Sequence, residues 1–336
     1  MFNLSLEDKI FKSDAASISD KLTIISGYIG AETVSMLQRY PEKKFVIVYG
    51  MYASDGISKA LHDALVDLQA KMPWIEIKYS LIPVHSKIYC WSKANVITEV
   101  LVGSANFSIN GLRRDYKETL YPISSLAYEE YKAYSKYVLD RSISCTVATK
   151  FNSTPILPVE NTQPLAAQGI CRISLLDSKN QVPAMSGLNW GKSNGNVVDG
   201  DAYLSIKVKY IRTFPDLFPP KKYVKDEVNT NSLGKITRAN DAVELIWDDK
   251  HSMIGLLEGN NTIGDVVYPN KLCSSNGKKE LGDYIRQRIE NKLGKRIFNA
   301  STIPVITKNI LDQYGRTHID ISKIGDGIYY LDFSVE

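Results

Sequence analysis

Short apolar runs alternate with amphipathic segments along residues 1–145 of this 336-residue chain. Runs of β-branched residues predict strands, and apolar residues three or four positions apart predict helices. The predicted strands are 22–26, 45–49, 75–79, 87–91, 96–102 and 120–123. The predicted helices are 58–72 and 127–139. Strands interleaved with helices indicate an α/β domain built from a sheet flanked by helices.

The pattern changes after residue 149. Residues 150–168 carry three prolines and few charges, which is typical of a linker. Beyond it, short strands are predicted at 172–176, 202–208, 242–247, 253–257 and 328–333, with one helix at 279–293. Glycine- and asparagine-rich loops lie at 186–200 and 259–277. The sequence thus predicts domains at 1–149 and 169–336, the second a mostly-β open barrel whose long loops carry function.

Composition narrows the class of protein. Hydrophobic residues make up 44% of the chain and charged residues 23%, which excludes a disordered chain. No apolar stretch is long enough to span a membrane, and residues 1–12 contain acidic residues and no apolar core. We therefore expect an intracellular protein with no membrane partner. The four cysteines form no CxxC pair, so they are expected to be reduced and buried rather than zinc ligands.

The net charge of +4 says little alone, but basic residues are concentrated locally. Residues 207–225 contain six basic residues and one acidic residue, and residues 278–296 contain seven and three. Such stripes are expected where a protein binds phosphate, and a solvated surface would explain them equally well.

The segments with candidate chemistry are His85-Ser-Lys87 and Gly103-Ser-Ala-Asn106. His85 and Lys87 are two residues apart at the start of one predicted strand, so their side chains share a face. Ser104 and Asn106 are also two residues apart, at the end of the next predicted strand. Imidazole can act as a nucleophile or as an acid–base group, and Lys, Ser and Asn can hold phosphate oxygens. The four residues predict a site that handles phosphate without a metal or other cofactor.

This pair of segments resembles the signature of the phospholipase D superfamily, His-x-Lys-(x)4-Asp followed by Gly-Ser-x-Asn. The superfamily's Asp falls at Ser92 here, which favours the nuclease branch over lipid hydrolysis. In many members of the superfamily an acidic residue follows Gly-Ser-x-Asn, and the stretch Asp115-Tyr-Lys-Glu118 resembles that position. Glu118 is therefore expected to orient His85. Because superfamily sites combine two such signatures and this chain has one, a homodimer through the N-terminal domain is implied.

The second half resembles the NgoFVII-type restriction endonucleases. The segments that carry this resemblance are Ser186-Gly-Leu-Asn-Trp-Gly191, Leu281-Gly-Asp-Tyr-Ile-Arg286-Gln-Arg288, Tyr314-Gly-Arg316 and Tyr329-Tyr-Leu-Asp-Phe333. The family joins a phospholipase D-like nuclease domain to a B-three-like (B3-like) DNA-binding pseudobarrel. Its N-arm and C-arm loops, which enter the DNA major groove, would correspond to residues 186–196 and 268–279.

The residues of these loops suit DNA contact, since Asn can pair with adenine and Lys can reach guanine. The candidates are Asn189, Trp190, Lys192, Ser193, Asn194, Asn196, Ser274, Ser275, Asn276, Lys278, Arg286 and Arg288. For Trp190 a packing role competes with base stacking. Arg286 and Arg288 are two apart on a helix, so at most one faces DNA. Arg316 is interpreted as structural.

The resemblance predicts a prokaryotic cytoplasmic, sequence-specific restriction endonuclease that cleaves double-stranded DNA without metal through a phosphohistidine intermediate. A DNA-binding subunit that needs a separate helicase-like ATPase to cleave remains an alternative. The chain has no Gly-x-x-x-x-Gly-Lys-Ser/Thr segment, so any ATPase would be another polypeptide. A phospholipase or phosphatidyl-transferase fits less well. The recognition sequence does not follow from the residues.

Overall fold

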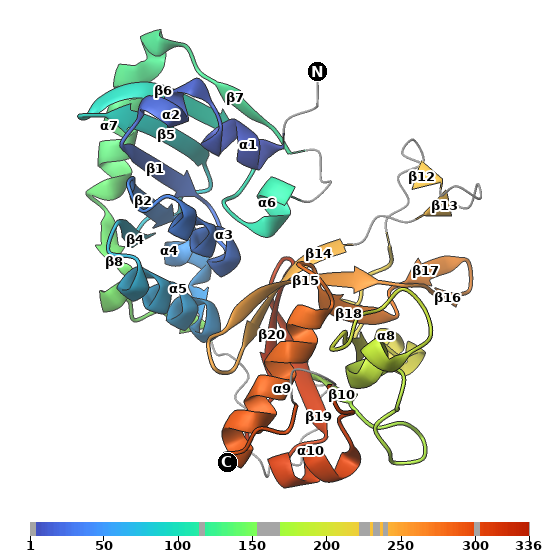
Figure 1. The fold of residues 1–336 in the computed structure, drawn as a ribbon. Helices are drawn as coiled ribbons and strands as arrows, with labels where there is room; N and C mark the ends of the chain where they lie inside the picture. Colours follow the sequence, from blue (N-terminus) through green and yellow to red (C-terminus); the bar gives the residue numbers. More distant parts are fainter. Residues whose placement is uncertain are drawn as a thin grey trace. The chain divides into compact units, whose positions relative to one another are not determined.

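The computed structural model describes residues 5–113, 118–152, 169–221, 229–230, 236–237, 241–298 and 303–335. It divides into two compact units, Met1–Ile156 with Lys250–Ser252, and Leu157–Asp249 with Met253–Glu336 (Figure 1). Of the predicted linker, 150–168, all but the first three residues lie outside the described part of the chain.

The first unit is built on a seven-stranded mixed sheet in the order β7-β6-β5-β1-β2-β4-β8. Its strands are β1 (Lys21–Ser26), β2 (Lys44–Tyr49), β4 (Ile75–Ser80), β5 (Lys87–Lys93), β6 (Val96–Gly103), β7 (Leu120–Pro122) and β8 (Ser142–Ser144). Strands β1, β2 and β4 are parallel, and the flanking strands pair antiparallel. A short pair, β3 (Ile57–Ser58) with β9 (Phe151–Asn152), lies outside this sheet.

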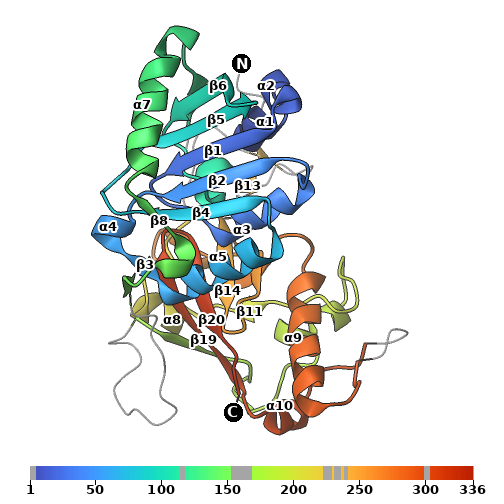
Figure 2. The ribbon, with the colours of Figure 1, turned by 90° about the vertical axis from the view of Figure 1, so that its left-hand side faces the viewer.

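Helices cover both faces of this sheet (Figure 2). They are α1 (Leu6–Phe11), α2 (Asp14–Ile18), α3 (Ala31–Ser35), α4 (Tyr52–Asp55), α5 (Lys59–Lys71), α6 (Ile109–Arg113) and α7 (Tyr128–Leu139). Successive side chains of β5 point to opposite faces of the sheet, so their contacts identify which helices cover each face. Cys90 packs with Tyr131 of α7, whereas the Trp91 indole donates to the carbonyl of Ile10 in α1 at 2.7 Å. Lys87 therefore points to the same side of the sheet as Trp91.

The second unit has a seven-stranded sheet in the order β10-β19-β20-β14-β15-β18-β11, which curls into a nearly closed barrel. Its strands are β10 (Cys171–Ser174), β11 (Leu204–Ser205), β14 (Asp241–Trp247), β15 (Ser252–Glu258), β18 (Lys271–Ser274), β19 (His318–Gly325) and β20 (Ile328–Asp332). Two small hairpins are β12 (Asn229–Thr230) with β13 (Ile236–Thr237), and β16 (Asn261–Ile263) with β17 (Val266–Tyr268). The helices are α8 (Val208–Thr213), α9 (Lys279–Leu293) and α10 (Lys308–Tyr314).

The predicted fold class is confirmed for both halves, a mixed sheet flanked by helices and then a mostly-β barrel. One predicted strand is wrong. Residues 202–208 contain only the two-residue β11, and helix α8 begins at Val208, where Tyr210 and Ile211 enter the core. The sequence also missed β18, β19 and α10. Across the described ranges, no helix has both the length and the apolar character needed to cross a membrane.

Candidate active site and nucleic-acid interface

Three of the five predicted catalytic residues, His85, Lys87 and Asn106, meet at the carboxyl end of β1. In the antiparallel pair of β1 and β5, Ser26 is the register partner of Lys87, and the parallel bridge Ile29–Phe107 brings the turn after β6 to the same place. His85 is solvent-exposed and lies two residues before β5 begins. The sheet register thus brings the two sequence segments together, because their strands are adjacent.

Gly27 marks the point of convergence. A Cβ atom there would lie 2.9 Å from Cδ2 of His85, 3.3 Å from Nζ of Lys87 and 3.4 Å from Oδ1 of Asn106. The three side chains therefore crowd around a residue that has no side chain of its own. A larger residue at position 27 would displace at least one of these side chains.

The amide of Asn106 is held in one orientation. Its Oδ1 accepts from the backbone N–H of Tyr28 at 3.2 Å, and it lies 3.3 Å from the Ser26 hydroxyl, whose one hydrogen is shared with the Tyr28 carbonyl at 2.6 Å. These bonds identify the oxygen, so the amide NH₂ is the free end. Within the described residues that NH₂ has no hydrogen-bond partner, which leaves it able to donate to an anionic oxygen.

Lys87 is 7% exposed, and its Nζ donates to the backbone carbonyl of His85 at 2.5 Å. Burial lowers the pKa of Lys87, and the nearby carboxylate of Glu118 opposes that shift. Glu118 thus acts on Lys87. Although both residues are described, no hydrogen bond joins Glu118 to His85, so its expected orienting contact is not present in this structure.

Ser104 is exposed at the end of β6. Its Oγ accepts from the backbone N–H of Thr119 at 3.1 Å, which leaves the hydroxyl hydrogen free to donate. Gly103 allows this contact, because a Cβ there would lie 1.8 Å from the Thr119 carbonyl oxygen. Ser104 is therefore placed by Thr119, the residue before β7, whereas Asn106 is placed by the turn after β1.

Two residues at this site were not predicted from the sequence. The Tyr28 ring lies edge to face with that of His85, with centroids 6.0 Å apart at 80°, and its hydroxyl donates to Asp55 at 2.5 Å. Tyr28 follows β1 and Asp55 ends α4. Their sequence signal was weak, since neither belongs to a recognisable pattern. The position after a buried strand that pairs with the His-x-Lys strand could have suggested Tyr28.

In the second unit the two predicted loops lie side by side. β11, after the first loop, pairs with β18 of the second loop. The backbone N–H of Ala202 donates to the carbonyl of Lys278 at 3.1 Å. Helix α9 closes this junction, because a Cβ on Gly282 would lie 1.9 Å from the Gly200 oxygen.

Three predicted DNA-contacting side chains are buried in this junction. Asn189 is 0% exposed and bonds to Pro183 and to both backbone groups of Ile306. The Ser274 hydroxyl bonds to Gly277 and Leu281. Arg286 is 5% exposed and donates to the carbonyls of Gly200 and Leu188, both at 3.0 Å. These hydrogen bonds of the three buried side chains all lie within the domain, and of their buried polar atoms only Nε of Arg286 has no partner among the described residues. Because buried and internally bonded groups are not available to a base, we reassign the three to the loop framework.

Arg288 also has an internal partner. Its guanidinium donates to both carboxylate oxygens of Asp248 at 2.6 Å. Burial is the largest single effect and lowers the pKa of Arg288, but the hydrogen bond to Asp248 and the nearby charges together outweigh it, so the net shift is upward. Arg316 bonds to Asp320 and Asp332, in agreement with its interpretation as structural.

Trp190 is half-buried, and its contacts within the domain match the packing role weighed for it. It packs edge to face on Tyr203, and two ammonium groups lie over its ring, Lys271 at 4.3 Å and Lys278 at 4.8 Å from the centroid. Lys278 also pairs with Glu258 at 2.8 Å. Trp190 thus holds two lysines together between the loops. Of these, Lys271 was not among the DNA-contact candidates predicted from the sequence.

The remaining candidates are nearer to solvent. The exposed ones are Asn194, Asn196, Ser275 and Asn276, and the half-buried ones are Lys192 and Ser193. Lys192 pairs with both carboxylate oxygens of Asp199 at 2.9 Å. The loop tips thus carry short polar side chains with hydrogen-bonding capacity.

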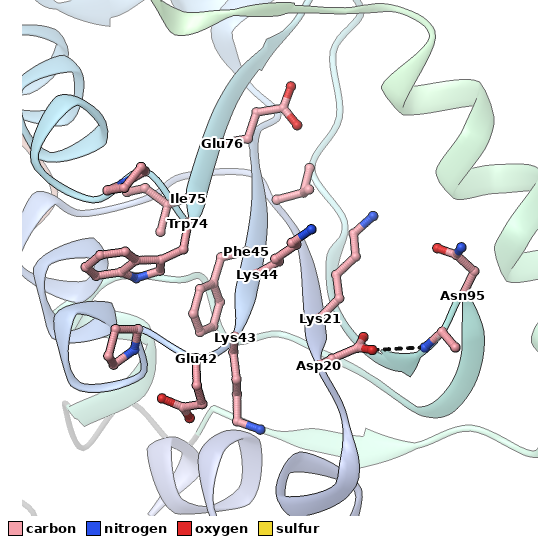
Figure 3. A pocket seen from close by; sticks show the side chains of 14 residues that line it. Asp20, Lys21, Glu42, Lys43, Lys44, Phe45, Trp74, Ile75, Glu76 and Asn95 are labelled. Atoms are coloured by element: carbon pink, nitrogen blue, oxygen red, sulfur yellow. Dashed lines mark hydrogen bonds between the residues drawn. The ribbon is translucent and has the colours of Figure 1, made fainter.

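An open hollow of about 840 Å³ lies at the other end of the first sheet (Figure 3). Lys21, Lys44 and Glu76 line it where β1, β2 and β4 begin, so it is separate from the catalytic residues at the end of β1. Among the residues that the structure describes, no group of three His, Cys, Asp or Glu side chains is arranged as a metal site.

Comparisons with known proteins match both halves of the chain. Residues 4–149 match the family model of the NgoFVII restriction endonuclease N-terminal PLD domain, and residues 165–325 match that of the NgoFVII C-terminal B3-like DNA-binding domain. NucT from Helicobacter pylori is similar at 18% identity with a TM-score of 0.32, over 41% of this chain and 90% of NucT. Polyphosphate kinase from Porphyromonas gingivalis is similar at 13% identity and a TM-score of 0.30, over 46% and 24%. No curated protein matches the chain.

Proposed function

The chain belongs to the NgoFVII restriction endonuclease family, and from this premise we propose that it cleaves double-stranded DNA at specific sequences, without metal, through a covalent intermediate on His85. The nuclease class follows from the family. The chemistry at phosphorus, the subunit arrangement and the base-reading residues are the proposal.

The observation that carries the proposal is the convergence of His85, Lys87 and Asn106 around Gly27. A nucleophile, a cation and an amide donor in one place match what a phosphodiester needs. A ring nitrogen of His85 attacks phosphorus while the bond to the leaving DNA oxygen breaks. A second histidine donates the proton that this oxygen takes up. Water then attacks the phosphohistidine, releasing the DNA phosphate and the imidazole.

The oxygens of the phosphate need donors that are fixed before the reaction. The Asn106 NH₂, the Lys87 ammonium and the Ser104 hydroxyl supply them. Donors fixed in advance stabilise developing negative charge without reorganisation, and each is worth about 10²–10³ in rate. Because Lys87 is buried, its charge acts through little solvent.

The second histidine is proposed to come from another copy of the chain. The sequence contains one His-x-Lys, and His62, His251 and His318 are not followed by Lys two residues later. His62 bonds to the Tyr79 hydroxyl, and His318 lies in the second unit beside Asp320. A homodimer with a two-fold axis at the site would supply the acid as the partner subunit's own His85.

Sequence specificity is proposed to lie in the two loops of the barrel unit. The exposed tips Asn194, Asn196, Ser275 and Asn276 would read base edges, and Lys271 and Lys278 around Trp190 would contact phosphate.

The test is digestion of plasmid DNA by the purified chain in excess EDTA without ATP, alongside His85→Ala. Discrete fragments from the wild type and none from the variant are expected. A smear would contradict sequence specificity. Cleavage only with magnesium, or only with ATP and cell extract, would contradict a metal-independent enzyme that acts alone. Cleavage only with ATP and cell extract would favour a subunit that works with a separate ATPase.

A further inference from the structure

Tyr28 contacts two catalytic groups at once. Its backbone N–H donates to Oδ1 of Asn106 at 3.2 Å, and its ring lies edge to face with the ring of His85. Its other end is also held, since the hydroxyl donates to Oδ2 of Asp55 at 2.5 Å. Tyr28 is 37% exposed, so it forms part of the surface that a substrate would meet.

Asp55 is suited to hold this hydroxyl. It is the last residue of α4, and Gly56 follows with φ 68°, a left-handed conformation that turns the chain away after the carboxylate. Hydrogen bonds from Tyr28 and Ser54 lower the pKa of Asp55, and the charges of Lys150 and His85 act in the same direction. The hydrogen bond to Asp55 raises the pKa of Tyr28 to about 12. Near neutral pH the pair is therefore a protonated phenol donating to an ionised carboxylate.

We propose that Tyr28, anchored by Asp55, is a positioning residue that fixes the Asn106 amide and the His85 ring for attack on phosphorus. The Tyr28 ring limits rotation of the imidazole from one side, and its backbone N–H keeps the Asn106 oxygen turned away from the substrate. Neither group bonds to the phosphate in this scheme. The inference rests on the proposed function, since it assigns a role in the same reaction.

The position of Asp55 explains why a phenol is needed rather than any ring. A phenylalanine would keep the edge contact with His85 but lose the hydrogen bond that anchors the ring from α4. A side chain that gains rotational freedom spends less time in the reactive arrangement, and small displacements of reacting groups cost large factors in rate.

The experiment measures single-turnover cleavage of plasmid DNA, with full-length protein in excess, and the Kd for the same DNA by filter binding. The variants are Tyr28→Phe, Asp55→Ala, the double variant and Asp55→Asn, which keeps an oxygen acceptor. Tyr137→Phe is the matched control, because Tyr137 is 49% exposed on α7. Wild type and His85→Ala are run in parallel.

Tyr28→Phe and Asp55→Ala should each lower the cleavage rate about tenfold. The double variant should lose no more than either single variant, because both break one bond. The Kd should stay within about twofold, Asp55→Asn should recover most of the rate, and Tyr137→Phe should match the wild type. A changed Kd with an unchanged rate would overturn the positioning role and indicate a DNA contact.

The two levels of the proposal fail differently. A wild type without cleavage, or an active His85→Ala, would refute the proposed function and with it this inference. An active wild type, an inactive His85→Ala and a Tyr28→Phe as fast as the wild type would refute the inference alone. Additive losses in the double variant would show that the two residues act separately.

Discussion

Gly27 lies directly against His85, and a Cβ at Gly27 would come within 2.9 Å of the imidazole Cδ2. The atoms that a methyl group would meet are the ends of side chains, His85, Lys87 and Asn106, rather than backbone. The proposed catalytic arrangement is therefore more sensitive to this position than the fold is.

Gly27→Ala should lower the single-turnover cleavage rate by about 10²-fold, because the added methyl group displaces the nucleophile and the ammonium. The melting temperature should change little, since side chains can move aside. Gly103→Ala is the contrast, because there the Cβ meets the backbone oxygen of Thr119 at 1.8 Å and the fold itself must shift. Equal losses of stability in both variants would contradict this distinction.

Arg286→Ala should destabilise the barrel unit. The substitution leaves the buried carbonyls of Gly200 and Leu188 without their donor, and each unpaired group costs about 1–3 kcal/mol. Urea denaturation measures the loss. Arg212→Ala, at an exposed position of α8, should stay within about 0.5 kcal/mol of the wild type. A fully stable Arg286→Ala that loses DNA binding would return Arg286 to the DNA-contacting set.

The two kinds of loop residue should separate in binding assays. Asn276→Ala should weaken binding to the cleaved sequence by about tenfold and leave nonspecific binding unchanged. Lys278→Ala should weaken both and reduce the salt slope by about one. Lys308→Ala, an ion-paired lysine on α10, should change neither. If only Lys278→Ala lost specificity, Lys278 would be the base contact and Asn276 would not.

The barrel unit should lose stability as the pH falls from about 6.5 to about 4. Burial lowers the pKa of His318 to about 4, with Asp320 opposing the shift and Arg172 and Arg316 adding to it. Because the unfolded chain binds a proton at higher pH than the folded chain, protonation favours unfolding within this window. Urea titrations at pH 7 and pH 5 should show a smaller pH-dependent loss for His318→Gln than for the wild type. An equal loss in both would contradict a contribution from His318.

The sequence predicted the first sheet well because its strands are short β-branched runs between turns. All six predicted strands there are present, and β5 and β6 pair as required for His85, Lys87 and Asn106 to meet. Residues 202–208 misled the prediction because Leu204, Ile206 and Val208 alternate with polar residues, as in a strand. Burial of Tyr210 and Ile211 against the barrel decides in favour of α8.

Side-chain roles in the loops could not be predicted in the same way. Asn189 and Asn194 are the same residue type in one loop, yet Asn189 bonds to Ile306 across the domain and Asn194 is exposed. Only the tertiary structure separates them. The same holds for Tyr28 and Asp55, which are brought together by β1 and α4 rather than by spacing in the sequence.

The most direct test of the central claim is to trap the covalent intermediate. End-labelled duplex DNA is mixed with excess wild-type protein in EDTA and quenched in alkaline denaturant, which preserves a phosphorus–nitrogen bond to histidine. The account predicts label attached to the wild-type chain, mapped by peptide sequencing to His85, and none on His85→Ala. Efficient cleavage with no labelled protein at any time, or label on another residue, would contradict His85 as the nucleophile.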